Sequence, residues 1–369
     1  MSSIQLKTIY FLLFIAVNLS FAQNALLSAD AKVSVLTCGK GQELYTTFGH
    51  TALRIKDDKT QLDIVFNYGQ FNFNEGNFYL KFIKGNLQYS IGAAYFTDFI
   101  YEYQFENREV VEQILQLQLT QKQQLFDLLM ASRYTPDESH YTYKFIDRNC
   151  TTMVVEKINA ILGAALINKV DDKKISYREV LYPKFENYFW YKLGINIIFG
   201  SKVDQPSKKL FLPIELLHSL DNLKVKGKPL VEKKQVLVQD QQATMPFSFL
   251  NSVYFVALLL LCLYFINRVF ITNLYFFITG ALGIFLCAVG LYSLHQELLW
   301  NYNALLFNPL FAVISFLKNK KILLCLLILI VVSIVLYVII LINKPHLLLL
   351  LPFIICHAAL VARKITQLH

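Results

Sequence analysis

A cysteine and a histidine stand in local sequence that suits nucleophilic chemistry. Cys150 follows a polar segment and precedes apolar residues at helical spacing, which predicts that it lies in the first turn of a helix. Asp147 or Asn149 would cap that helix. Unpaired backbone N–H groups and the helix dipole stabilise a thiolate at such a position. The pattern therefore indicates a thiol nucleophile.

A thiol nucleophile needs a base, because a free thiol is only a few per cent ionised at neutral pH. Three histidines precede the apolar part of the chain: His50, His140 and His218. His140 falls in a polar loop, and His218 lies in an amphipathic stretch. His50 follows Phe48-Gly49 at the start of a predicted strand, where a structural role is an equal alternative. The helix-starting cysteine favours His50 as the general base.

Predicted strands and tight turns would fix the position of His50. Alternating residues predict strands at 33–37, 50–55 and 62–70, with a hairpin turn at 57–59. The ring of a histidine base should be oriented by a third polar group. Asn67 and Asp63 share one face of the third strand and are the candidates, with Asn67 preferred.

The segment that follows predicts one more strand and a helix. Leu115, Leu117 and Leu119 alternate with glutamines, which is typical of a strand. Thr120 would then cap a helix.

Composition divides the 369 residues into two parts. A mean hydropathy of +0.42 with 55% hydrophobic residues indicates membrane content. Residues 1–22 resemble a signal peptide, with a short apolar core and a small-x-small cleavage site. We expect an exported domain at 23–246 and a transmembrane domain at 247–369. The net charge of +9 is scattered, without a basic stripe, so no nucleic acid partner is expected.

About five apolar runs follow residue 247 and are long enough to cross a bilayer. They are predicted at 250–266, 274–294, 305–317, 322–342 and 347–361. The third contains Pro309 and is either a kinked or a re-entrant helix.

Export of the first domain orients these spans. Arg268, the basic segment 318–321 and Arg363-Lys364 then lie in the cytoplasm, as the positive-inside rule requires, while Lys344 lies outside. The loop 295–303 also lies outside, on the side of the thiol. It is either a simple solvated turn or the floor of the active site.

If the loop 295–303 forms the floor of the active site, then His295, Glu297 or Asn301 would bind a lipid headgroup or an acceptor amine.

Of the six cysteines, only Cys38 and Cys150 belong to the exported domain. A disulfide between them would make the protein a non-catalytic scaffold. The alternative is that at least one remains a reactive thiol. No zinc spacing, phosphate loop or dinucleotide fingerprint is present, so neither a metal nor another cofactor is expected.

Three motifs carry a resemblance to a known family. They are Phe48-Gly49-His50-Thr51-Ala52-Leu53-Arg54-Ile55, Phe66-Asn67-Tyr68-Gly69-Gln70-Phe71-Asn72-Phe73, and Tyr143-Lys144-Phe145 through Asn149-Cys150-Thr151-Thr152. In combination they resemble the Lnb family of lipoprotein N-acyltransferases, over roughly residues 32–369. Lys144 and Met153 depart from the family pattern, where an acidic and a basic residue are more usual.

The resemblance implies an α+β fold for the exported part. The domain is similar to circularly permuted papain-like proteins of the NlpC and lecithin–retinol acyltransferase type, in which the histidine strand precedes the cysteine helix. An α-helical transmembrane bundle of about five helices would follow, and the protein would reside in a bacterial inner membrane.

The resemblance also implies a two-step acyl transfer. Cys150 would take an acyl chain from a membrane phospholipid as a thioester, and the α-amine of a diacylglyceryl-cysteine lipoprotein would accept it. His50 would serve as the base in both steps. A membrane-anchored cysteine amidase or peptidase of the cell envelope is the alternative enzyme, because the same pair of residues would suit it.

Overall fold

The computed structural model describes residues 26–71, 76–135, 139–242 and 246–368. The predicted signal peptide, residues 1–22, lies outside them. The N-terminal part is built on a seven-stranded antiparallel sheet with the order β6-β4-β3-β2-β1-β5-β9. Its strands are β1 (Lys32–Cys38), β2 (His50–Asp57), β3 (Leu62–Gln70), β4 (Gln88–Tyr95), β5 (Val110–Leu115), β6 (His140–Thr142) and β9 (Val231–Val238). A small separate hairpin joins β7 (Lys224–Val225) to β8 (Lys228–Pro229).

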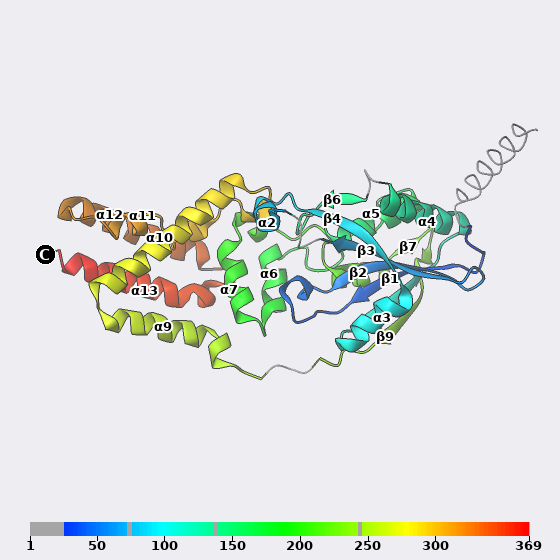
Figure 1. Cartoon of the computed structure of the whole chain (residues 1–369), viewed down its shortest axis with the longest axis horizontal. Coiled ribbons are helices and arrows are strands. Elements are labelled where there is room, and N and C mark those ends of the chain that lie inside the picture. Colours follow the sequence, from blue (N-terminus) through cyan, green and yellow to red (C-terminus); the bar gives the residue numbers. More distant parts are fainter. Residues whose placement is uncertain (1–25, 72–75, 136–138, 243–245, 369) are drawn as a thin grey trace, which may run out of the picture.

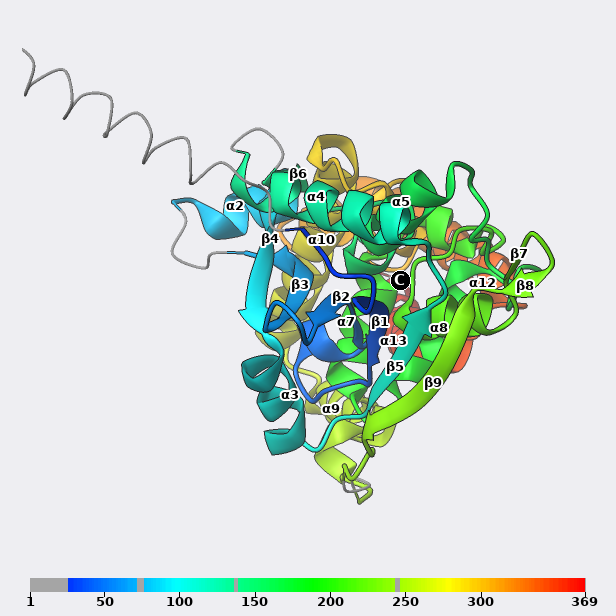
Figure 2. The same ribbon diagram turned by 90° about the vertical axis from the view of Figure 1, so that its right-hand side faces the viewer.

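Helices cover the sheet unequally. α4 (Leu119–Tyr134), α5 (Cys150–Leu162) and α8 (Pro213–Asp221) bury one face in a large apolar core, and α3 (Phe96–Phe105) covers part of the other (Figure 2). A mixed α+β fold is therefore confirmed for the N-terminal part. The predicted strands at 33–37, 50–55 and 62–70 are present as β1, β2 and β3.

The strand predicted through Leu115, Leu117 and Leu119 is wrong. β5 ends at Leu115 and α4 already begins at Leu119. Gln118, not Thr120, is the capping residue, and its backbone N–H donates to the Gln121 side chain at 3.0 Å. Alternation over five residues also fits a strand end followed by a buried turn residue, and Leu117 is buried in such a turn.

Short helices lie between the sheet and the apolar C-terminal part. They are α2 (Phe78–Lys84), α6 (Tyr177–Leu181) and α7 (Phe189–Ile198), with 3₁₀ turns at Leu44–Thr46, Tyr182–Phe185 and Ser201–Asp204. Phe189 and Leu193 of α7 pack in the core of the C-terminal helices. Apolar packing therefore crosses the boundary predicted at residue 246.

The C-terminal part is a bundle of apolar helices (Figure 1). Its members are α9 (Val253–Ile266), α10 (Val269–Tyr292), α11 (Leu310–Ile314), α12 (Lys320–Leu341) and α13 (Leu347–Thr366). Three of them, α10, α12 and α13, are long and apolar enough to cross a membrane. α9 has only 14 residues, so five full-length spans are not established.

The third predicted span is not a continuous helix. A 3₁₀ turn at Tyr302–Leu305 and the five-residue α11 flank Pro309. This segment packs directly on the backbone of α10, where a Cβ on Gly283 would lie 1.7 Å from the Phe307 carbonyl oxygen. Asn308 and Ser333 donate hydrogen bonds that satisfy the broken backbone region: Asn308 to the Ser333 hydroxyl, and Ser333 to the Leu305 carbonyl.

The two ends of the bundle differ in charge. Lys344 reaches Asp204 of the N-terminal part at 3.1 Å, which places the turn after α12 beside the sheet domain. Arg363 and Lys364 bond instead to Tyr264 and Asn273, at the opposite end. Lys344 and the pair Arg363-Lys364 therefore lie at opposite ends of the bundle.

A buried ion network fixes the sheet domain on the bundle. Arg178 is 1% exposed and bonds Asp204 at 2.8 Å and the Asn196 side chain at 3.0 Å. Asp204 also accepts from the Tyr302 hydroxyl at 2.8 Å and pairs with Lys344. Because these groups come from both parts of the chain, the network holds the sheet domain and the bundle in one relative orientation.

Candidate active site

Cys150 is the first residue of α5, as its sequence predicts. Of the two proposed caps, Asn149 is the one used: its side-chain oxygen accepts from Thr152 N–H at 3.0 Å. The Asn149 amide also donates to the carbonyls of Phe145 and Phe211, at 2.8 and 2.9 Å. With its cap fixed on both sides, the helix holds the half-buried thiol in a defined place.

His50 interacts with the thiol from the start of β2. Burial alone raises the pKa of Cys150, but the charge of His50, its hydrogen bond and the Thr51 backbone N–H bring that pKa below the ordinary 9.0. Burial alone lowers the pKa of His50, but the Cys150 charge and hydrogen bonds to Cys150 and Asn67 bring it above 6.5. These opposite shifts favour a thiolate–imidazolium pair.

Backbone packing fixes the start of β2. Gly49 has φ +80°, and a Cβ there would lie 2.4 Å from the Cys38 carbonyl oxygen, so only glycine fits. Phe48 packs against Phe145 and Phe185, with ring centroids 5.3 Å away in both cases. The Thr51 and Thr151 hydroxyls, 3.0 Å apart, join β2 to α5.

The structure places the two candidates for the polar group that orients the His50 ring at different distances from that ring. Asn67 Oδ1 lies 3.1 Å from His50 Nε2 and accepts a hydrogen bond from that ring N–H, which leaves the other ring nitrogen for the thiol. Asp63 lies four residues away along β3 and pairs with Arg54 at 2.7 Å. Asp63 is therefore not brought to the His50 ring.

The loop before Cys150 rests on the turn between α10 and the broken segment. Lys144 donates to the carbonyls of Gly85 and Leu294, at 2.8 and 3.0 Å. Lys202 bridges Asp147 and Gln296, at 3.1 and 2.7 Å. Lys144, which departs from the family pattern, thus has a structural use here. The transmembrane part supports the thiol loop directly.

Of the three loop residues predicted to bind substrate, Glu297 is the one beside the thiol loop. Its carboxylate accepts from the Ile146 N–H at 3.3 Å and is 2% exposed. The second carboxylate oxygen has no partner among the described residues. His295 instead reaches the Phe82 carbonyl oxygen at 3.0 Å. Asn301 uses its amide on the carbonyls of Ile197 and Ile198, both at 2.9 Å, which is a structural role.

Two tyrosines near the thiol were not assigned a role from the sequence. Tyr141 belongs to the apolar core against which Tyr143 and Cys150 pack. Burial raises the pKa of both Tyr141 and Tyr143, and the Cys150 charge raises it further. The Tyr-x-Tyr spacing before the cysteine was visible, but alternation alone says nothing of distance. Lys202 was also missed, because no local pattern links it to residue 147.

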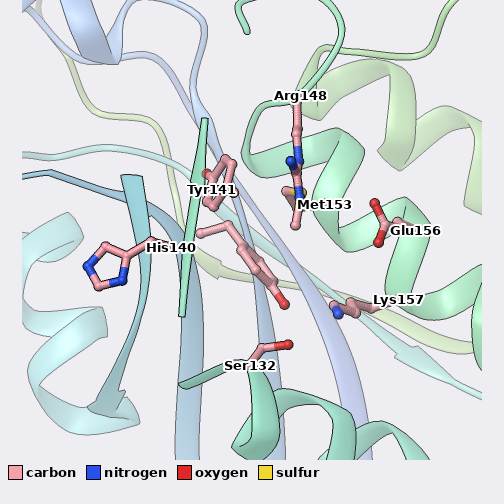
Figure 3. A pocket seen from close by; sticks show the side chains of 8 residues that line it. Ser132, His140, Tyr141, Arg148, Met153, Glu156 and Lys157 are labelled. Carbon is pink, nitrogen blue, oxygen red and sulfur yellow. The ribbon is translucent and has the colours of Figure 1, made fainter. Parts of the chain in front are cut away.

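A pocket of about 260 Å³ lies beside Tyr141, along the first turns of α5 (Figure 3). Arg148, Glu156 and Lys157 give it a polar lining. His140 lies on β6 and points away from the pocket centre (Figure 3). The polar lining suits a charged or hydrated part of a substrate.

The second exported cysteine is not bonded to the first. Cys38 and Cys150 are both free thiols. Burial raises the pKa of Cys38 to about 12, so Cys38 remains protonated. The disulfide-linked scaffold has no support in this structure. Among the described residues, no group of three or more metal-ligating side chains is gathered.

Comparison with known proteins agrees with the family resemblance. Residues 20–182 match the family model for the Lnb N-terminal periplasmic domain. This segment contains His50, Asn67 and Cys150, and it ends before the apolar helices. No curated protein and no solved structure matches the chain. The N-terminal part of the chain therefore matches the Lnb N-terminal periplasmic domain, and an apolar helical part follows that domain.

Proposed function

We propose that this protein is a lipoprotein N-acyltransferase of the inner membrane, with Cys150 as nucleophile and His50 as general base. The observation that carries the proposal is the Cys150–His50–Asn67 arrangement at the start of α5, in a domain fixed to apolar helices. The match of residues 20–182 to the Lnb N-terminal periplasmic domain supports lipoprotein maturation as the process.

In the first step, the Cys150 thiolate attacks the carbonyl carbon of a phospholipid ester. The carbon–oxygen bond breaks, and the imidazolium of His50 gives its proton to the departing lysophospholipid oxygen. The backbone N–H of Cys150 lies in the first helical turn, where no intrahelical acceptor exists, and would stabilise the oxyanion. The product is an acyl thioester.

In the second step, the α-amine of a diacylglyceryl-cysteine lipoprotein attacks the thioester. Neutral His50 takes the amine proton, the carbon–sulfur bond breaks and the thiolate returns. Asn67 keeps the ring oriented through both steps, since it holds the nitrogen that does not face sulfur. Ester is converted to amide, so the transfer requires no metal or energy source.

Mass spectrometry of a model lipoprotein tests this proposal. Its N-terminal peptide should carry three acyl chains in cells with this gene and two in cells without it. Two chains in both strains would refute the proposal. If the purified protein instead released free fatty acid from a Cys150 thioester while an acceptor lipoprotein was present, the hydrolase alternative would be favoured.

Glu297 is proposed to bind the ammonium form of the acceptor amine before it is deprotonated. Its unpartnered carboxylate oxygen is buried, and its other oxygen accepts from Ile146 of the loop that precedes Cys150. Glu297 forms no ion pair among the described residues, and an incoming ammonium would supply a hydrogen-bonded cation for its carboxylate.

Glu297→Gln should therefore raise the KM for the acceptor about tenfold, the effect of losing one charge-assisted hydrogen bond. Thioester formation from phospholipid should be unchanged, because that step precedes acceptor binding. Glu112→Gln is the matched control: Glu112 is equally buried but pairs with Arg54. If Glu297→Gln slowed thioester formation as much as transfer to the acceptor, Glu297 would only support the thiol loop.

A further inference from the structure

The short helix α2 leaves its apolar side chains uncovered. Leu80 is 65% exposed, Phe82 49% and Ile83 36%. Lys81 and Lys84 stand among them in the same two turns. An exposed apolar face with lysines beside it is typical of a helix that lies in a membrane interface.

The end of α10 fixes α2 in place. Ser293 donates to the Ile83 carbonyl and the Leu294 N–H to the Lys84 carbonyl, both at 2.7 Å. The last carbonyls of α2 are thus bonded by the residues directly after α10. Gly85 ends the helix at φ +74°, and a Cβ there would lie 2.8 Å from the His295 ring. The contact therefore leaves no space for a larger residue.

This attachment places α2 at the level where a membrane span ends. α10 has 24 residues, about 36 Å of helix, which exceeds the roughly 30 Å hydrocarbon core. Leu291 and Tyr292 at its end are 91% and 58% exposed. They continue the apolar surface of α2, which lies beside the end of α10 nearest the sheet domain (Figure 1).

A row of aromatic rings leads from α2 toward the thiol. Phe82 stacks on Phe78 at 6.4 Å, and Phe78 contacts Phe71 at 6.0 Å. Phe71 contacts Tyr89 at 5.1 Å, and Tyr89 stacks on Tyr143 at 4.4 Å. Tyr143 and Cys150 pack against the same apolar core. The members of the row nearest α2 are phenylalanines, and Tyr89 also contacts Tyr141, which lines the polar pocket.

We propose that α2 and the end of α10 form a phospholipid-binding surface in the outer leaflet, and that the aromatic row guides a donor acyl chain to Cys150. A phospholipid fits because the surface continues a membrane span and combines apolar side chains with lysines, which suit acyl chains and phosphates. The guiding role rests on the proposed acyltransferase function. The lipid-binding surface does not depend on it.

Photocrosslinking tests the surface in the full chain. Benzoylphenylalanine is placed at Leu80, at Leu258 on α9 or at Leu119 on α4, in protein reconstituted in phosphatidylethanolamine–phosphatidylglycerol vesicles. Leu258 and Leu119 are 45% and 43% exposed, but only Leu258 belongs to the bundle. Mass spectrometry should find phospholipid adducts at positions 80 and 258 and only background at 119. Adducts at 258 without adducts at 80, or a protein adduct at 80, would overturn the proposal.

Donor choice tests the guiding role. Leu80→Gln and Phe82→Gln should slow Cys150 acylation from phospholipid vesicles about tenfold, the effect of losing roughly half the burial of one large apolar side chain. Acylation by soluble p-nitrophenyl butanoate should stay unchanged, and Leu119→Gln should alter neither rate. Equal losses with both donors would overturn the guiding role. A parent protein that crosslinks lipid at position 80 but is never acylated would retain the surface and refute the enzyme.

Discussion

Cys150→Ala is expected to abolish N-acylation while the protein still inserts and folds. The thiol is the only proposed attacking atom, so its loss should reduce the transfer rate on the order of 10⁴-fold or more. Alanine keeps the helix start, because the Asn149 cap bonds to Thr152 and not to the Cys150 side chain. The measurement is the acyl content of a model lipoprotein in cells that carry only this variant.

Cys38→Ala is the matched control. Cys38 pairs in register with His50 and is also a free thiol of the N-terminal domain, but it is buried and protonated. This variant should keep most of the activity and lose some stability. Triacylated product at the parent level in Cys150→Ala cells would refute the nucleophile, and equal inactivity of Cys38→Ala would remove the distinction between the two thiols.

A hydroxylamine-labile acyl group should accumulate on Cys150 when phospholipid is supplied without an acceptor. Two-step transfer must pass through this thioester. His50→Ala should slow its formation by roughly 10²-fold or more, because the thiol loses its base. Intact-mass spectrometry measures the adduct. If the spectra show only the free thiol before acceptor is added, and the protein then completes several turnovers with acceptor, the acyl chain is transferred directly and not through a thioester.

The shifted pKa values of the pair predict the pH dependence of the reaction. The pKa of the thiol is shifted below 9.0 and the pKa of the imidazole above 6.5, so each group favours the charged form of the other. Alkylation of Cys150 by iodoacetamide at pH 7 should be at least roughly tenfold faster in the parent than in His50→Ala. In the His50→Ala variant, the alkylation rate should rise only as the pH approaches the ordinary pKa of a thiol. Superimposable profiles would show that His50 does not ionise the thiol.

The local parts of the site could be predicted from the amino-acid sequence. A polar cap before apolar residues at helical spacing is enough to begin a helix at Cys150 and end it near Gly163, as α5 does. Alternation and turn residues placed His50 at the start of a strand, and the same periodicity put Asn67 on one strand face. These features depend on neighbours within a few residues, and so they are visible without the fold.

Which of the candidate residues lie close together depends on the packing of distant segments. Asp63 and Asn67 share a strand face, but antiparallel pairing brings Asn67 opposite Ala52, two residues from His50, and Asp63 opposite Lys56. Hydropathy marked the segment around Pro309 as apolar, but its close packing on Gly280 and Gly283 of α10 keeps it from forming one helix. The buried position of Glu297 under the thiol loop follows from a contact across 151 residues. Such contacts depend on how separate elements dock, and no local periodicity specifies that.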